Sequence, residues 1–85
     1  DYEIEELDLY TRYNDYVLTS IRTSWGMPLT DLRSTFGEEI YHYCLRMAKP
    51  HIREGVLEIS EDVLKLTRKG FFVSDGIMSD LMWVD

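Results

Sequence analysis

The sequence predicts a mostly helical α+β domain that contains one small sheet. Three observations lead to this fold class. Apolar residues recur at helical spacing over residues 9–23 and again over residues 38–49. Apolar and polar residues alternate in two short runs between residues 57 and 66, which is the period of half-buried strands. A helical pattern returns after Thr67. We therefore expect about four helices and one small antiparallel β-hairpin.

The first two predicted helices both end at a glycine. We expect the first helix over residues 9–23, with Gly26 just beyond it as a C-terminal stop. One face of this helix carries its apolar residues, which are Leu9, Tyr13, Tyr16, Val17 and Ile21. A short second helix should begin at Thr30, whose hydroxyl suits an N-cap, and should end at Gly37.

The third predicted helix should lie at the centre of the domain. It spans residues 38–49 and begins with two glutamates, whose charge suits a helix N-terminus. Pro50 should kink or restart it before a last turn over residues 52–54. Its apolar residues form two stripes, one of Ile40, Tyr43, Cys44 and Met47 and one of Tyr41, Leu45 and Ala48. A helix with two apolar stripes packs against neighbours on both sides.

A hairpin and a closing helix complete the predicted fold. The hairpin pairs residues 57–59 with residues 64–66 around a turn at residues 60–63. Thr67 then caps a single fourth helix that runs to the end of the chain. The residues expected to close the core from these two elements are Leu57, Ile59, Leu64, Leu66, Phe71, Ile77, Met78, Leu81 and Met82. This order of elements predicts a winged-helix-like bundle with an added final helix.

The acidic residues are concentrated at the start of the chain. The 85 residues carry a net charge of −7, and five of the 16 acidic residues lie in residues 1–8. Residues 9–85 contain 11 acidic and 9 basic residues, so the rest of the chain is close to neutral. We expect an acidic lead-in or linker over residues 1–8 and one small domain over residues 9–85.

The composition excludes several classes of protein. The single cysteine, Cys44, rules out an internal disulfide and a paired-cysteine metal site. No apolar run approaches the roughly 20 residues that a membrane span needs, and no signal peptide is recognisable at the start. These features are typical of a cytoplasmic chain.

The helix–turn–helix order raises the possibility of DNA binding, but the charges oppose it. The expected recognition helix begins at Glu38 and Glu39, the end from which bases are usually contacted. The expected hairpin tip, Glu61 and Asp62, is also acidic and would repel phosphates. We expect no nucleic acid partner, and a free-standing winged-helix DNA-binding regulator stays as an alternative.

The sequence offers no catalytic constellation and no metal site. His42 and Cys44 lie two positions apart on a helix and therefore point in different directions, while Pro50 disturbs the geometry before His51. The glycines stand singly, so no phosphate-binding loop is present, and no serine has a positioned histidine. We expect no catalytic residue, no metal ligand and no enzymatic activity from this chain alone.

The candidate binding residues lie on or just after the first helix. Asn14 stands in the middle of that helix, where its propensity is unfavourable. Arg22 lies near the helix C-terminus and Trp25 just beyond it. We expect Asn14, Arg22 and Trp25 to form a surface that meets another domain or its ligand.

Several short motifs resemble one protein family when they are taken in order. The chain carries Asn14-Asp15 and then Ile21-Arg22, the turn Gly55-Val56-Leu57, the motif Leu66-Thr67-Arg68-Lys69-Gly70, and finally Ser74-Asp75. This order and spacing resemble the C-terminal domain of the oxygen-independent coproporphyrinogen III oxidase family, over about residues 8–83. That family belongs to the radical S-adenosylmethionine proteins.

The resemblance implies a role in porphyrin and haem biosynthesis as an accessory domain. The full-length oxidoreductases of this family join a catalytic barrel, with a [4Fe-4S] cluster and S-adenosylmethionine, to this C-terminal domain. With those cofactors they decarboxylate two propionates of coproporphyrinogen III. The present chain has no cluster motif, so the resemblance implies that these cofactors belong to an N-terminal barrel. It implies that barrel as the partner, a tetrapyrrole bound by the full-length protein, and no membrane span.

The resemblance leaves two kinds of full-length protein open. One branch of the family acts as a coproporphyrinogen dehydrogenase, and a sister branch binds haem and acts as a haem chaperone. Both share this C-terminal domain. The motifs that separate the branches lie upstream of the present chain.

Overall fold

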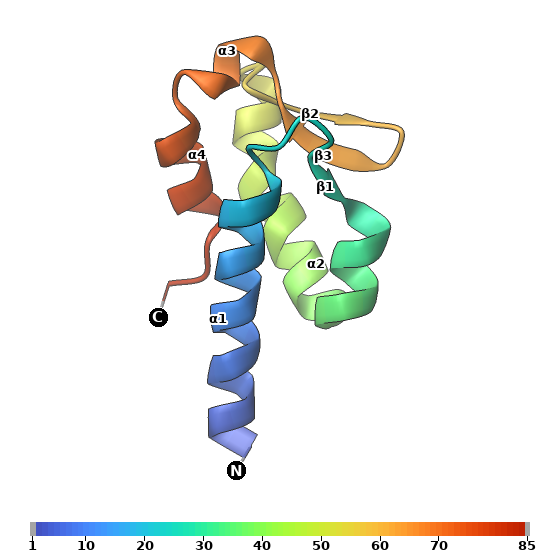
Figure 1. The fold of residues 1–85 in the computed structure, drawn as a ribbon, viewed down its shortest axis with the longest axis vertical. Helices are drawn as coiled ribbons and strands as arrows, with labels where there is room; N and C mark the ends of the chain where they lie inside the picture. The colour runs from blue at the N-terminus through green and yellow to red at the C-terminus, as the bar shows by residue number, and fades with distance from the viewer. Residues whose placement is uncertain (1, 85) are drawn as a thin grey trace.

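A computed structural model describes residues 2–84 and confirms a mostly helical α+β fold with four helices and a three-stranded antiparallel sheet (Figure 1). The elements in chain order are α1 (Tyr2–Ser20), β1 (Met27–Pro28), α2 (Leu29–Arg53), β2 (Leu57–Ser60), β3 (Val63–Leu66), α3 (Arg68–Phe71) and α4 (Ser74–Leu81). Helices α1, α2 and α4 lie side by side, and the sheet and α3 lie at one end of them.

Helix α1 begins and ends earlier than we predicted. It starts at Tyr2 rather than at about residue 9 and ends at Ser20 rather than at Thr23. The acidic segment at residues 2–8 contains no glycine or proline and is rich in glutamate, which is a good helix former, so it continues the helix. This extension projects beyond the rest of the molecule in Figure 1. A domain boundary at residue 8 stays a prediction.

The second and third predicted helices are two arms of α2. Gly37, with φ 90° and ψ 175°, interrupts the helical dihedral angles, and the helix resumes directly after it. Thr30 is not the N-cap, because the helix begins at Leu29 and the Thr30 hydroxyl instead donates to Asp62 Oδ2 at 2.8 Å. Pro50 lies inside α2 and does not end it, because helical geometry continues to Arg53.

The predicted hairpin is confirmed, and it gains a third strand. β2 and β3 are joined by a two-residue turn at Glu61 and Asp62, both in the left-handed region at φ 52° and 63°. Two such residues match the twist of antiparallel strands. β1 pairs with β3 in the order β1-β3-β2. This strand spans two residues, too few to show any periodicity, and the sequence therefore did not predict it.

The predicted fourth helix is divided into α3 and α4. Thr67 caps α3 as expected, since its hydroxyl accepts from the Gly70 N–H at 3.1 Å. The helix then breaks at Phe72 and Val73 before α4 begins. Gly70 lies so close to Val56 that a Cβ there would be 1.9 Å from the Val56 carbonyl oxygen. This contact fixes the direction of α3, and α4 needs a different direction to pack on α1 and α2.

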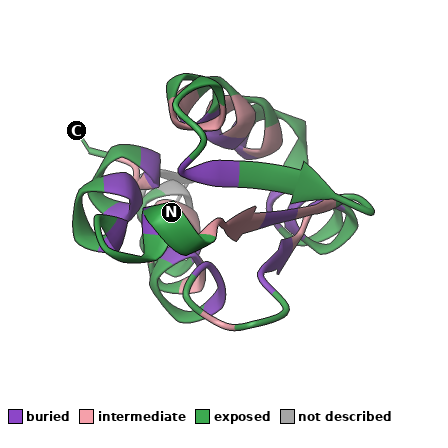
Figure 2. Cartoon of the chain, turned by 90° about the horizontal axis from the view of Figure 1, so that it is seen from above, coloured by how far each residue is buried: buried purple, intermediate pink, exposed green. Residues whose placement is uncertain are grey.

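The core lies between the helices and the inner face of the sheet, and the buried segments face the middle of the molecule (Figure 2). Its buried apolar residues are Tyr13, Val17, Ile21, Met27, Leu29, Leu32, Phe36, Ile40, Cys44, Ala48, Val56, Leu57, Leu64, Ile77, Met78 and Leu81. Two predicted core residues, Ile59 and Phe71, are exposed instead. Ile59 is the next-to-last residue of β2 and lies beside the hairpin turn, where the strand is exposed.

The C-terminal strap, residues 81–83, is held against α1 and α2 by side chains. The Tyr13 hydroxyl donates to the Leu81 carbonyl at 2.7 Å, and the Tyr43 hydroxyl donates to the Met82 carbonyl at 2.9 Å. The Asn14 amide donates to the Trp83 carbonyl at 3.0 Å, and its oxygen accepts from the Trp83 N–H at 2.7 Å. These contacts join residues that are distant in sequence and close the bottom of the core.

Candidate functional site: a basic groove with exposed aromatic rings

An open groove of about 480 Å³ lies where the end of α1, the end of β3 and α3 meet. We call this the basic groove. Its lining residues are Ile21, Arg22, Thr23, Ser24, Lys65, Leu66, Thr67, Arg68, Phe71 and Phe72. These residues come from two segments that are more than forty positions apart, and the fold alone brings them together.

The first wall of the basic groove is held by a compact turn after α1. The Thr23 hydroxyl donates to the Ser20 carbonyl at 2.7 Å and accepts from the Gly26 N–H at 3.1 Å. Gly26 has φ 72°, and a Cβ there would lie 2.7 Å from the Leu64 carbonyl oxygen. Glycine therefore permits the turn to lie directly on β3, which places Arg22 beside the strand.

The second wall is α3, which is fixed at both ends of its single turn. The Thr67 hydroxyl donates to the Gly55 carbonyl at 2.7 Å while it accepts from the Gly70 N–H. The close approach of Gly70 to Val56 anchors the other end. Phe71 and Phe72 follow at the end of α3 with 54% and 83% of their surface exposed. The fold therefore presents two phenyl rings to solvent from a fixed base.

The charge of the groove is opposite to that of the whole chain. Arg22, Lys65 and Arg68 line it, and no acidic residue does. Among the described residues, none of these three cations has a hydrogen bond or an ion pair. An acidic protein thus carries a local site with free cations beside apolar rings, which can bind carboxylates attached to an apolar body.

The structure separates the three predicted binding residues. Arg22 lies in the basic groove, and Trp25 follows in the same turn with 75% of its surface exposed. Asn14 lies elsewhere on α1, where both ends of its amide bind the Trp83 backbone. An asparagine in the middle of a helix was a correct signal of a specific contact, but the contact lies within the domain.

Sequence reasoning missed the two phenylalanines of the groove. Phe71 was assigned to the buried face of one continuous helix, and Phe72 was not assigned to a site. The signal was present as three consecutive apolar residues, Phe71 to Val73, between a glycine and a polar pair. Such a run on the surface is unusual unless it binds something.

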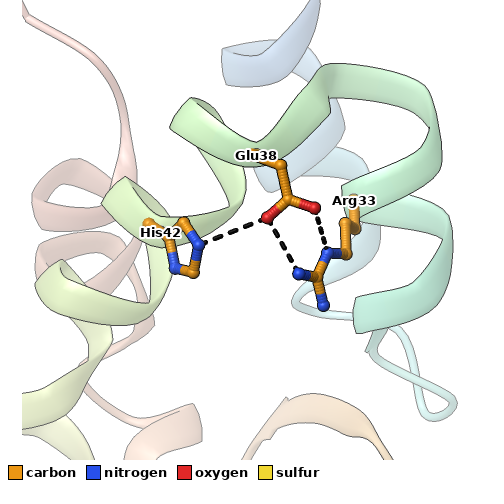
Figure 3. A network of polar contacts seen from close by, with 3 residues as sticks. All are labelled: Arg33, Glu38 and His42. Carbon is orange, nitrogen blue, oxygen red and sulfur yellow. Dashed lines mark hydrogen bonds and ion pairs between the residues drawn. The ribbon is translucent and has the colours of Figure 1, made fainter.

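Two polar residues of the expected recognition helix, Glu38 and His42, form a network with Arg33 of the preceding arm of α2 (Figure 3). Arg33 donates to both carboxylate oxygens of Glu38 across the Gly37 kink, with Nη2 at 2.8 Å from Oε2. His42 Nε2 lies 3.3 Å from the same carboxylate. The hydrogen bond from Arg33 lowers the pKa of Glu38 and raises that of Arg33. These side chains stabilise the kink in α2.

The residues present do not fit an iron–sulfur cluster or another metal. Cys44 is fully buried, and burial raises the pKa of its thiol, which disfavours the thiolate that a cluster needs. His51 is engaged with Asp80, at 2.8 Å between Nε2 and Oδ2. Within the described part of the chain, no group of three or more metal-binding side chains comes together. No helix in that part is long and apolar enough to cross a membrane.

The fold and the groove define a small winged-helix-like module with an exposed basic groove. Comparison with protein families gives the more specific assignment. Residues 7–73 match the model of the HemN C-terminal domain, and the chain belongs to this family. Neither the curated proteins nor the solved structures contain a match.

Proposed function

We propose that this chain is the accessory C-terminal domain of a radical S-adenosylmethionine protein that acts on tetrapyrroles. In this role it packs against a catalytic barrel and helps to cover the tetrapyrrole site, and it is not catalytic alone. The observation that carries the proposal is the family match over residues 7–73. The unpaired cations and exposed aromatic rings of the basic groove support it, because a surface of this kind is suited to contact with another domain.

The chemistry of such a protein would reside outside this chain. An iron–sulfur cluster and S-adenosylmethionine would belong to the barrel, since Cys44 is buried and unsuited to a cluster. The role of this domain would be to help position the tetrapyrrole and to exclude water from its site. Of the three predicted binding residues, Arg22 and Trp25 remain candidates for contact with the barrel or its ligand because both are exposed. Asn14 instead binds the Trp83 backbone.

Arg22 is the residue that tests whether the basic groove contributes to tetrapyrrole binding, directly or through contact with the barrel. Its guanidinium makes no hydrogen bond to a described residue, and its planar fork suits a carboxylate of either partner. We expect Arg22→Ala in the full-length protein to weaken tetrapyrrole binding about tenfold or more, as the loss of a charge-assisted hydrogen bond implies. The measurement is a spectroscopic titration with coproporphyrin and with haem, together with turnover of coproporphyrinogen.

A matched control is Arg53→Ala, because Arg53 is an exposed arginine at the end of α2, outside the basic groove. Unchanged binding and turnover in a correctly folded Arg22→Ala protein would contradict a role of Arg22 in tetrapyrrole binding. The two ligands of the titration also separate the branches of the family. Turnover identifies the oxidase, and tight haem binding without decarboxylation identifies the chaperone.

A further inference from the structure

The apolar run at the break between α3 and α4 is the starting observation. Phe71, Phe72 and Val73 are consecutive in sequence, and each has more than half of its surface exposed. Helix α3 ends at Phe71 and α4 begins at Ser74, so this run lies at the junction of two short helices. Three exposed apolar residues in a row on a fixed base are typical of a protein interface.

The cations beside this run indicate the chemistry of the partner. Arg22, Lys65 and Arg68 surround the apolar floor of the groove without any acidic neighbour in its lining. Solubility does not require them, because the chain already carries a net charge of −7. Their sign instead complements a partner that carries carboxylates.

The shape of the site distinguishes a protein segment from a planar ligand. The Phe71 and Phe72 rings are 6.3 Å apart and inclined at 87°, so they present an edge and a face. A flat macrocycle needs a flat stacking surface, whereas the side chains of a peptide segment can fill an angular one. The geometry therefore favours an irregular segment with acidic and apolar side chains.

We infer that the basic groove is the docking site for an acidic, apolar segment of the barrel of the same protein. This rests on the proposed function, and it goes further by naming the surface and the chemistry of its partner. Apolar side chains of that segment cover Phe71 and Phe72, and its carboxylates pair with Arg22 and Arg68. The groove thus holds the two domains together, whether or not a tetrapyrrole is bound.

The test is hydroxyl-radical footprinting of Phe72 in the full-length protein without tetrapyrrole. We expect Phe72 to be oxidised slowly, although 83% of its surface is exposed in the domain alone. The double substitution Arg22→Glu/Arg68→Glu should raise the rate toward that of an exposed side chain. The control Lys49→Glu/Arg53→Glu makes the same change of charge on α2 and should keep the rate slow.

Three outcomes would overturn the inference. Rapid oxidation of Phe72 in the unmodified protein would show an uncovered groove. Protection that appears only when coproporphyrin is added would assign the groove to the tetrapyrrole. Protection that survives both Arg22→Glu/Arg68→Glu and the milder Arg22→Gln/Arg68→Gln, with circular dichroism verifying the fold, would remove the role of the cations.

A parallel measurement separates this inference from the proposed function. Deletion of the domain from the full-length protein should abolish tetrapyrrole binding or turnover if the proposed function is right. Unchanged turnover after deletion would contradict the proposed function itself. A free Phe72 in a protein whose turnover depends on the domain would contradict only the docking site.

Discussion

Gly70 shows how a single missing side chain fixes the second wall of the groove. A Cβ at this position would lie 1.9 Å from the Val56 carbonyl oxygen, which is backbone and cannot rotate away. We expect Gly70→Ala to lower the free energy of unfolding by about 2 kcal/mol or more, since overpacking at a rigid contact is costly. Urea denaturation of this chain measures the change.

Gly76 provides the matched control for Gly70. It lies inside α4, and a Cβ there would meet nothing within 4 Å. Gly76→Ala should therefore raise the free energy of unfolding by about 0.5–1 kcal/mol, because alanine is the better helix former. Equal effects at the two glycines would contradict the close contact between α3 and Val56.

Tyr13 predicts how stability depends on alkaline pH. Burial raises the pKa of its phenol, so the folded protein retains the proton more tightly than the unfolded chain does. The resulting stability is fully present below the unfolded pKa of about 10 and is lost as the pH rises above it. The free energy of unfolding should therefore fall steeply above pH 10.

Tyr13→Phe tests this assignment. The variant leaves the Leu81 carbonyl without its 2.7 Å hydrogen bond, which should cost about 1 kcal/mol at neutral pH. Its stability should then fall less than that of the parent above about pH 10. Parallel alkaline curves for the two proteins would show that Tyr13 does not control the transition. Burial also raises the pKa values of Cys44, Tyr16 and Tyr43, which are present in both proteins, so both curves should fall and the difference between them reports on Tyr13 and its contact with Cys44.

The residue scale also shows which functions of a side chain the sequence can predict. Thr67 was correctly predicted as an N-cap, because the cap lies three residues from its donor at Gly70. Thr30 has the same hydroxyl but binds Asp62, 32 positions away. Contacts between residues close in sequence can be predicted from their spacing. A contact between distant residues can replace them, and the sequence gives no sign of it.

At the scale of elements, the C-terminal strap determines how α4 is held. Asn14→Ala would leave both the N–H and the carbonyl of Trp83 without their side-chain partner. We expect a loss of about 1–3 kcal/mol in the free energy of unfolding, as for unsatisfied polar groups that are partly buried. Thermal denaturation followed by circular dichroism measures the loss.

Asp15→Ala is the control for this element, because Asp15 is the exposed neighbour of Asn14 on α1. A surface substitution of this kind should change stability by less than about 0.5 kcal/mol. A loss in Asp15→Ala as large as that in Asn14→Ala would indicate a general effect on α1 rather than release of the strap.

The elements were predicted well where a periodic pattern set them and poorly where packing did. The hairpin follows from alternation over residues 57–66 and was correct in its pairing and turn. Gly37 was correctly identified as an interruption, but the helix restarts at the next residue, so α2 is one element. The break at Phe72 and Val73 comes just after the close contact of Gly70 with Val56, and no local pattern contains such a tertiary contact.

At the scale of the whole molecule, the fold class and the family were within reach of the sequence, and the groove was not. Arg22 was predicted as a binding residue from its position alone. Its neighbours Arg68 and Phe71 come from a segment more than forty positions later, and only the packing of the turn at Gly26 on β3 joins them. The prediction therefore named one residue that lines the groove, Arg22, and could not name the residues that the fold places around it.

The charge distribution over the whole molecule bears on the DNA-binding alternative. The free cations of the groove lie beside α3, whereas Glu38 on α2 and the hairpin tip at Glu61 and Asp62 are acidic. A helix–turn–helix protein bound to DNA needs its cations on the recognition helix and the wing. The acidic residues at these two places therefore argue against the DNA-binding alternative.

The length of α1 sets the minimum size of any partner that contacts both the first turns of this helix and the basic groove. The helix spans 19 residues, or about 28 Å, and the basic groove lies beyond its last turn. A partner that contacts Leu7 and also fills the groove must extend along most of this distance. Leu7 and Leu18 are eleven positions apart, on one face of α1, and both are exposed. A partner that packs along this face would bury a long, narrow surface on α1 rather than a compact patch.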